Sequence, residues 1–222
     1  IKIVQQGGSV KVAHQRIVVE KANEATVFYA VDTEYAPVYP LYKGENPQQN
    51  TGKIITKAIT KGYETVKNTH ISDYQTLYNR VRFTLTGDTA SEQLPTNVRV
   101  KQLQEGFTDD ASLKVLGFNL SRYLLISASR PGTLPSTLQG VWNTFEKAPW
   151  NGNFQSNINL QEMYWGCGPT HLPECEEAYL EWIEGLVEPG RQTAREYYGT
   201  KGWVSHSTGN IWGHTVPGDD IL

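Results

Sequence analysis

The sequence predicts a multidomain protein in which a β-rich first part is followed by an α-helical second part. Over residues 1–66 apolar and polar side chains alternate in short runs, a period of two that is typical of antiparallel strands with one solvated face. Over residues 109–222 the long apolar patterns have helical spacing instead. The intervening residues 67–108 include a polar stretch with Gly87 and Pro95, as linkers do, and we treat them as a linker.

The first part contains strand-like runs separated by turn residues such as Gly7, Gly8 and Asn23. After them, residues 38–50 are rich in Tyr, Pro, Gly and Asn and predict a long surface loop, and residues 51–65 predict a helix. Because so few strands seldom close a core without partners, this part looks incomplete. The predicted strands are residues 1–4, 9–12, 15–19 and 25–31.

Helical patterns account for most of the second part. A helix over 173–188 begins with Pro173, where the missing N–H costs least, and is expected to end at Pro189 and Gly190. Its apolar stripe is Cys175, Ala178, Tyr179, Trp182, Ile183, Leu186 and Val187. Shorter patterns predict helices after His70 and over 192–198. A helix over 112–127 carries Leu116, Leu120, Tyr123, Leu124 and Ser127 on one face.

Composition argues against several functional classes. The formal net charge is -3, with basic and acidic residues mixed along the chain, so no electrostatic footprint for nucleic acid is present. The apolar run 123–128 is far shorter than the roughly 20 residues that cross a bilayer. No phosphate-binding loop, zinc-protease motif or serine-hydrolase elbow occurs, and no metal or cofactor is implied. Cys167 and Cys175 could pair, but buried free thiols are favoured.

Tryptophans crowd into the second half of the chain. Pyranose faces stack on aromatic rings, while sugar hydroxyls need short polar partners, so this crowding beside Asn, Gln and His is typical of a sugar site. The alternatives are a Trp-rich core and, for each histidine, a hydrogen-bonded structural role. The expected substrate-binding residues are Trp142, Trp150, Trp165, His206 and Trp212.

Asn157 and Asn159 stand two positions apart, so in an extended segment both amides would point to one face. Two convergent carboxamides can hold a water molecule, but they cannot deprotonate it, because an amide has no useful pKa. Such a pair would need a carboxylate behind it. The alternative is a pair of turn or capping asparagines.

Four motifs together resemble the catalytic domain of glycoside hydrolase family 95. The resemblance is close over residues 70–222 and looser over 1–66. The motifs are Ser-Arg-Pro-Gly through Leu-Gln-Gly-Val-Trp-Asn (129–143), Pro-Trp-Asn (149–151), Asn-Ile-Asn-Leu-Gln-x-x-Tyr-Trp (157–165) and Gly-Trp-Val-Ser-His-Ser-Thr-Gly-Asn-Ile-Trp-Gly (202–213).

The resemblance implies a fold and a mechanism. Residues 1–66 would end an N-terminal β-sandwich, and 109–222 would begin an (α/α)6 barrel. The reaction would be inverting hydrolysis of terminal α-L-fucosides, with Asn157 and Asn159 positioning the water. The family's general-acid glutamate and base aspartate come later in the barrel, so we expect this chain to lack both and to be inactive alone.

Nearby carboxylates are not assigned as the acid. Asp219 and Asp220 are adjacent and favour a helix cap, and Glu162 has no motif support. Glu162 and Met163 stand where many family members read Met-Asn, so an α-L-galactosidase is an alternative, since the two sugars differ by one hydroxyl. The other alternative is a non-catalytic carbohydrate-binding fragment. The resemblance also implies a periplasmic or secreted protein.

Overall fold

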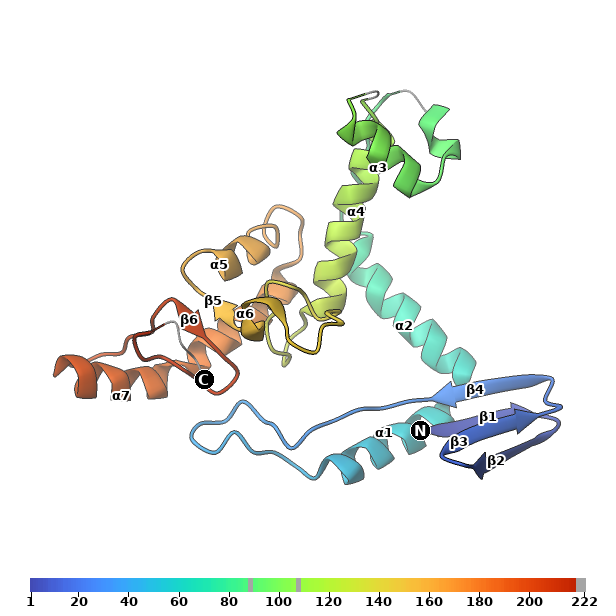
Figure 1. Cartoon of the computed structure of the whole chain (residues 1–222), viewed down its shortest axis with the longest axis horizontal. Coiled ribbons are helices and arrows are strands. Elements are labelled where there is room, and N and C mark those ends of the chain that lie inside the picture. Colours follow the sequence, from blue (N-terminus) through green and yellow to red (C-terminus); the bar gives the residue numbers. More distant parts are fainter. Residues whose placement is uncertain (88–89, 107–108, 219–222) are drawn as a thin grey trace. The chain divides into compact units, whose positions relative to one another are not determined.

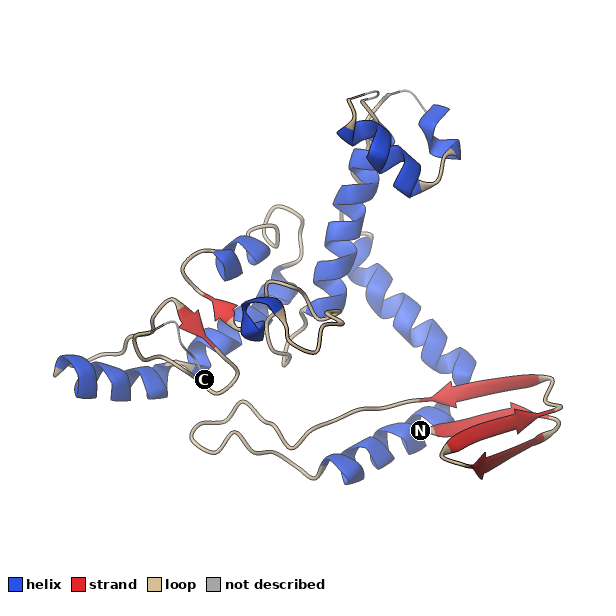
Figure 2. Cartoon of the chain, in the orientation of Figure 1, coloured by secondary structure: helices blue, strands red, loops and turns tan. Residues whose placement is uncertain are grey.

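The structure of the chain is a computed structural model that describes residues 1–87, 90–106 and 109–218. Asp219 and Asp220, expected to cap a helix, lie outside these residues. The chain divides into two compact units, Ile1–Asp73 and Tyr74–Leu222. Antiparallel strands come first and helices dominate afterwards (Figures 1 and 2), which confirms the predicted β-then-α order. The division falls inside helix α2, Tyr63–Tyr78, and the boundary proposed after residue 66 lies earlier in the same helix.

The four predicted strands form one long, interrupted hairpin. β1 pairs antiparallel with β4, and β2 with β3, across the turn residues His14 and Gln15. Both turn residues have positive φ, 50° and 61°, as two-residue hairpin turns that match the strand twist require. The strands are β1 (Lys2–Gln6), β2 (Ser9–Ala13), β3 (Arg16–Glu20) and β4 (Glu24–Phe28).

The interruption between the two strand pairs is a bulge. Gln6 pairs with Glu24 and Ser9 with Glu20, so two residues on one side oppose three on the other. Gly8 sits at this bulge with φ 65°, and a Cβ there would lie 2.1 Å from the carbonyl oxygen of Glu20. A side chain at this position is therefore excluded.

The helix expected over 51–65 is wrong in its bounds. α1 spans Pro47–Lys61, and it starts earlier because the Asn46 side chain accepts a hydrogen bond from the backbone N–H of Gln49. It stops at Gly62, whose φ of 77° breaks the helical path before α2 begins. Ile55 of α1 is the one buried apolar side chain among the described residues of this unit, so its sheet has no core of its own.

The second unit is built mainly from helices and short strands. Its elements are the 3₁₀ turns η1 (Ala90–Gln93) and η2 (Pro149–Gly152), the helices α3 (Thr96–Gln104), α4 (Ala111–Ala128), α5 (Asn159–Tyr164), α6 (Pro173–Gly185) and α7 (Val187–Tyr198), and the strands β5 (Phe154–Gln155) and β6 (Thr208–Gly209). Helix α3 lies where the sequence predicted only a linker. It is tied to the start of α4, because buried Arg99 binds both carboxylate oxygens of Asp110 at 2.8 Å.

The core of this unit forms around α6. The predicted α6 stripe is confirmed, with Cys175, Ala178, Trp182 and Leu186 buried and Tyr179 and Ile183 partly buried.

Helix α4 does not bury the face that was predicted. Its buried residues are Leu113, Arg122 and Ile126. The α4 face predicted from Leu116, Leu120, Tyr123 and Leu124 is exposed in the part of the chain that the structure describes.

Pro189 and Gly190 do not end a helix, contrary to the prediction. α6 stops at Gly185, and α7 runs through both residues. Pro189 is tolerated because the first N–H groups of a helix have no intrahelical partner to lose. Gly190 is required for close packing, since a Cβ there would lie 2.7 Å from the carbonyl oxygen of Val204.

Candidate functional site

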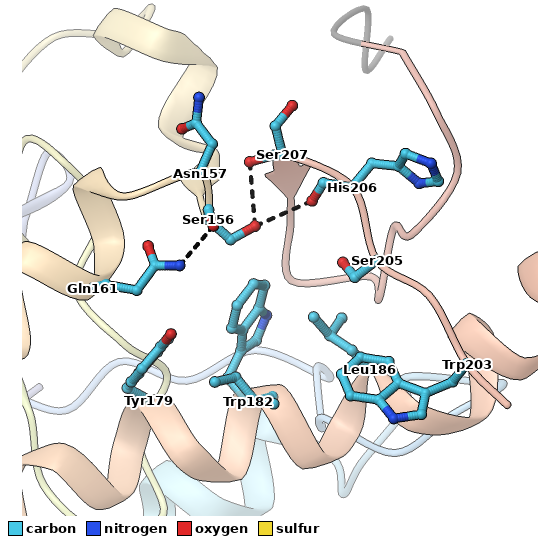
Figure 3. Close-up of a pocket in the computed structure, with 11 residues that line it drawn as sticks. Ser156, Asn157, Gln161, Tyr179, Trp182, Leu186, Trp203, Ser205, His206 and Ser207 are labelled. Carbon is cyan, nitrogen blue, oxygen red and sulfur yellow. Dashed lines mark hydrogen bonds between the residues drawn. The ribbon is translucent and has the colours of Figure 1, made fainter.

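A cavity of about 330 Å³ opens between the β5–α5 turn, helix α6 and the segment that precedes β6 (Figure 3). Its size falls in the range of small-molecule sites, which run from roughly 300 to 1,000 Å³. One wall is aromatic and aliphatic, and the opposite wall is polar. The lining residues are Ser156, Asn157, Gln161, Tyr179, Trp182, Ile183, Leu186, Trp203, Ser205, His206 and Ser207. We call this space the aromatic cavity.

At the floor of the cavity, the backbone of strand β6 passes close to the indole ring of Trp182. Trp182 packs edge-on against Phe154 of β5, with ring centroids 4.9 Å apart, and its indole N–H donates to the carbonyl of Asn210 at 3.3 Å. A Cβ on Gly209 would lie 2.6 Å from the Trp182 ring, so only glycine lets β6 cross this indole. The pairing of β5 with β6 and the packing of the Trp182 indole therefore depend on each other.

The polar wall is held by hydrogen bonds across the β5–β6 pair. The Ser156 hydroxyl donates to the carbonyls of His206 and Ser207 at 3.1 and 3.2 Å, and the Gln161 amide donates to the Ser156 carbonyl at 2.6 Å (Figure 3). These bonds join the start of α5 to the 203–207 segment. The two halves of the wall lie about fifty residues apart in sequence.

Buried Tyr164 supports the cavity from behind. Its hydroxyl lies 2.8 Å from that of Ser129 and accepts the backbone N–H of Ser136 at 2.9 Å. Its ring stacks on Tyr179, which lines the cavity, with centroids 5.3 Å apart. Burial raises the pKa of Tyr164, so the hydroxyl stays protonated.

The structure does not place Asn157 and Asn159 on one face of an extended segment, as was expected. Asn157 lies in a turn and lines the cavity, whereas Asn159 is the first residue of α5 and does not line it. Ile158 between them has φ 145°, so the segment turns rather than extends. The premise of an extended Asn-x-Asn pair is therefore wrong, and the role of the two amides is a separate question.

His206 lines the cavity, but its imidazole has two protein partners. Nδ1 lies 2.7 Å from the Thr215 carbonyl and Nε2 lies 2.7 Å from the Tyr198 hydroxyl. Since a carbonyl can only accept, Nδ1 donates to it, and in the neutral ring Nε2 accepts from Tyr198. The ring also stacks on Tyr198, and Figure 3 shows it directed away from Trp182. His206 therefore contributes its backbone to the cavity.

The tryptophans that line the cavity are not the ones that were predicted to bind substrate. Trp182 and Trp203 line the aromatic cavity, although neither was among the expected substrate-binding residues. The four that were expected do not line it, and they are not core residues either. Their exposed fractions are 51% for Trp142, 68% for Trp150, 62% for Trp165 and 55% for Trp212.

Two polar atoms of the cavity residues have unused hydrogen-bonding capacity among the described residues. Gln161 Oε1 and the Ser205 hydroxyl are both buried without a hydrogen-bond partner. Sequence reasoning did not single out either residue, although both belong to motifs that carried the family resemblance. Buried polar atoms left unpaired in this way are uncommon and are often found at functional sites.

Few of the described residues that line the cavity could transfer a proton. Among its lining residues there is no carboxylate, and the one histidine is engaged elsewhere. The aromatic wall and the uncharged polar wall of the cavity suit the binding of a neutral, hydroxyl-rich ligand.

Across the described part of the chain, no cluster of three or more His, Cys, Asp and Glu side chains could hold a metal ion. In the same residues, no helix is long and apolar enough to cross a membrane.

Cys167 and Cys175 lie in the hydrophobic core of the second unit as free thiols. Burial raises the pKa of Cys167 to about 12 and also raises that of Cys175. Both thiols therefore stay protonated at neutral pH and pack as small apolar groups.

Comparison with known proteins agrees with the motifs. The sequence pattern of the glycosyl hydrolase family 95 catalytic domain matches residues 62–222. The chain is 36% identical over 219 residues to alpha-L-fucosidase 2 of Arabidopsis thaliana, which covers 96% of this chain and 26% of that protein. It is 35% identical over 208 residues to a probable alpha-fucosidase A of Aspergillus niger, covering 90% of this chain and 26% of that protein. A probable alpha-fucosidase A of Aspergillus oryzae is 37% identical over 178 residues.

The fold and the motifs thus define a region of a carbohydrate-active protein. The chain belongs to glycosyl hydrolase family 95. It spans about a quarter of the length of the curated relatives it matches.

Proposed function

We propose that the whole protein hydrolyses terminal α-L-fucosyl residues of oligosaccharides or polysaccharides. The observation that carries this proposal is the match of residues 62–222 to the family catalytic domain, together with relatives that are named as fucosidases. The aromatic cavity supports it, because Trp182 and Trp203 offer faces for a pyranose ring and Ser205 and Gln161 offer unpaired polar atoms.

We further propose that the domain plan follows the family. Residues 1–66 would be the end of a β-sandwich, 67–108 a linker and 109–222 the first part of an (α/α)6 barrel. The exposed apolar faces of the strands and of α4 support this plan, since surfaces of this kind are normally covered.

The proposed reaction is inverting hydrolysis. A glutamic acid protonates the leaving oxygen, an aspartate on the opposite face deprotonates water, and Asn157 and Asn159 hold that water. Asn157 lines the cavity, which fits the role, and Asn159 would reach the water from the first turn of α5. The acid and base would come from the rest of the protein, because no carboxylate lines the cavity among the described residues.

Replacing Asn157 by Ala in the whole protein tests this role. A water held mainly in the transition state predicts a large fall in kcat with little change in KM for an aryl α-L-fucoside. The Asn159→Ala variant should behave alike. Unchanged kcat in both variants would reject the water-positioning role without rejecting the fucosidase activity.

A second candidate function applies to the 222-residue chain by itself. Because its cavity has aromatic walls and lacks a carboxylate, this part alone is expected to bind sugar without hydrolysing it. Parallel assays with aryl α-L-fucoside and aryl α-L-galactoside compare the two family activities. Turnover of either substrate by the short chain would show that the catalytic carboxylates lie within it.

A further inference from the structure

A second hollow lies at the end of helix α7. It has a volume of about 420 Å³ and is lined by Arg191, Arg195, Gly199, Thr200, Lys201 and Gly202. Three of these six residues are cations and none is acidic. We call it the cationic hollow.

Helix geometry brings the cations together. Arg191 and Arg195 are four residues apart on α7, so they share a face of the helix. Gly199, in the left-handed region with φ 60°, ends α7, and the following turn leads to Lys201. A Cβ on Gly199 or Gly202 would meet nothing within 4 Å, so the space beside both residues is open.

Two of the three cations in the hollow have no ion-pair partner among the described residues. Arg191 pairs with Glu188 at 2.6 Å, but Arg195 and Lys201 make no ion pair with the described residues. Glu196, the other acidic residue of α7, accepts a hydrogen bond from the neutral Gln192 amide and keeps its negative charge. Against Glu188, Glu196 and the partial negative charge of about half a unit at the helix end, the three cations leave a small positive surplus.

The two hollows flank one stretch of backbone. Gly202 lines the cationic hollow, and the next residue, Trp203, lines the aromatic cavity. Adjacent Cα atoms are about 3.8 Å apart, so the linings of the two spaces meet at this peptide bond.

We propose that the cationic hollow binds an oxyanion, a sulfate ester or a carboxylate, on the carbohydrate whose neutral sugar occupies the aromatic cavity. The nature of this ligand rests on the proposed function, whereas the anion site itself rests on the three cations. The arginines suit planar or tetrahedral oxyanions, because their guanidinium groups donate in a fixed fork. The substrate class is therefore an acidic, fucosylated polysaccharide.

The test measures binding of the whole protein to a sulfated α-L-fucan, to polygalacturonate and to a neutral fucosylated oligosaccharide, at low and at high salt. The variant is Arg195→Gln with Lys201→Gln. The matched control is Lys57→Gln with Lys61→Gln, which removes the same charge from exposed positions at the end of α1. Calorimetry gives the dissociation constants, and hydrolysis of a neutral aryl α-L-fucoside is measured in parallel.

The expected result is tighter binding of at least one acidic polysaccharide, weakened about 2- to 20-fold by the hollow variant and by salt. Selective binding of the fucan identifies sulfate as the anion, and selective binding of polygalacturonate identifies carboxylate. Equal losses in the variant and its control, or no preference for an acidic chain, would overturn the proposal. Loss of acidic binding with aryl fucoside turnover absent from every form would instead reject the fucosidase assignment and retain the anion site.

Discussion

Tyr164 shows how one buried hydroxyl can hold several segments behind a binding cavity. It joins the end of α4, through Ser129, to the loop that carries Ser136, while its ring supports Tyr179. Removing the hydroxyl would leave the Ser129 hydroxyl and the Ser136 backbone N–H without this partner. Both serines are buried, so water could not easily replace it.

We predict that Tyr164→Phe lowers the free energy of unfolding by about 1–3 kcal/mol, since it strands a buried N–H and a buried hydroxyl. The matched control is Tyr179→Phe, which removes a hydroxyl without a described partner and should change stability by less than about 0.5 kcal/mol. Denaturant titration of both variants measures the difference. If both variants changed the free energy of unfolding equally, the Tyr164 hydrogen bonds would contribute little to stability.

Glu174 makes stability dependent on pH. Its two carboxylate oxygens each accept from Arg80 at 2.8 Å, which lowers the pKa of Glu174 from its ordinary 4.5 to about 2. A depressed pKa stabilises the folded state when the group is ionised, so this contribution is complete above pH 4.5 and is lost as pH falls toward 2. Arg99 similarly holds the pKa of Asp110 well below its usual range.

We therefore expect Glu174→Gln to lower Tm at neutral pH, and the difference from the natural protein to shrink steadily as pH falls from 4.5 toward about 2. Subtracting the two pH profiles removes the shared contribution of Asp110. Glu177→Gln, on the same helix but without a described ion pair, is the control and should leave the profile unchanged. A difference that stays constant from neutral pH down to pH 2 would exclude the Arg80 ion pair as its source.

At the scale of elements, the junction of α6 and α7 shows why a close contact can override a local signal. Pro and Gly usually end a helix, but Pro189 and Gly190 lie in the first turn of α7. The Val204 backbone N–H donates to the Gly190 carbonyl at 3.2 Å, which brings the 203–207 segment onto the helix. This contact helps to place one wall of the aromatic cavity.

Gly190→Ala should consequently destabilise the protein by about 1–3 kcal/mol, because the added methyl group would overlap the Val204 carbonyl and the segment would have to move. Sugar affinity should fall with it. Gly117→Ala, in the middle of α4 with open space around it, is the control and should stabilise by about 0.5–1 kcal/mol. Thermal melts and sugar titrations of the two variants check this, and similar behaviour of both would contradict the proposed packing.

For the molecule as a whole, the sequence predicted elements more reliably than their surroundings. The four antiparallel strands and the α6 stripe follow from local periodicity, and both are confirmed. The turn at Asn157 depends on pairing of Phe154 with Gly209 and on the positive φ of Ile158, and neither can be read from nearby residues. The exposure of the tryptophans is likewise decided by tertiary packing, as is the choice of buried face on α4.

That exposed α4 face leads to a prediction about the chain and its parent protein. Leu116, Leu120, Tyr123 and Leu124 lie on one side of the helix, and Leu120 is 51% exposed. Contiguous apolar surface of this kind is normally covered by protein or causes self-association. If the rest of a barrel covers it, Leu120 is a core residue in the whole protein and a surface residue in the 222-residue chain.

Leu120→Lys should therefore have opposite consequences in the two contexts. In the 222-residue chain, which we expect to self-associate, it should leave stability unchanged and reduce aggregation, as measured by light scattering. In the whole protein it should cost at least the burial of a leucine, about 1.5–3 kcal/mol, because a charge would enter a covered apolar face. Leu160→Ala, at a position with no exposed surface, should instead cost about 2–5 kcal/mol in both. A neutral Leu120→Lys in the whole protein would mean that nothing packs on this face of α4, and the proposed barrel would then have to be abandoned.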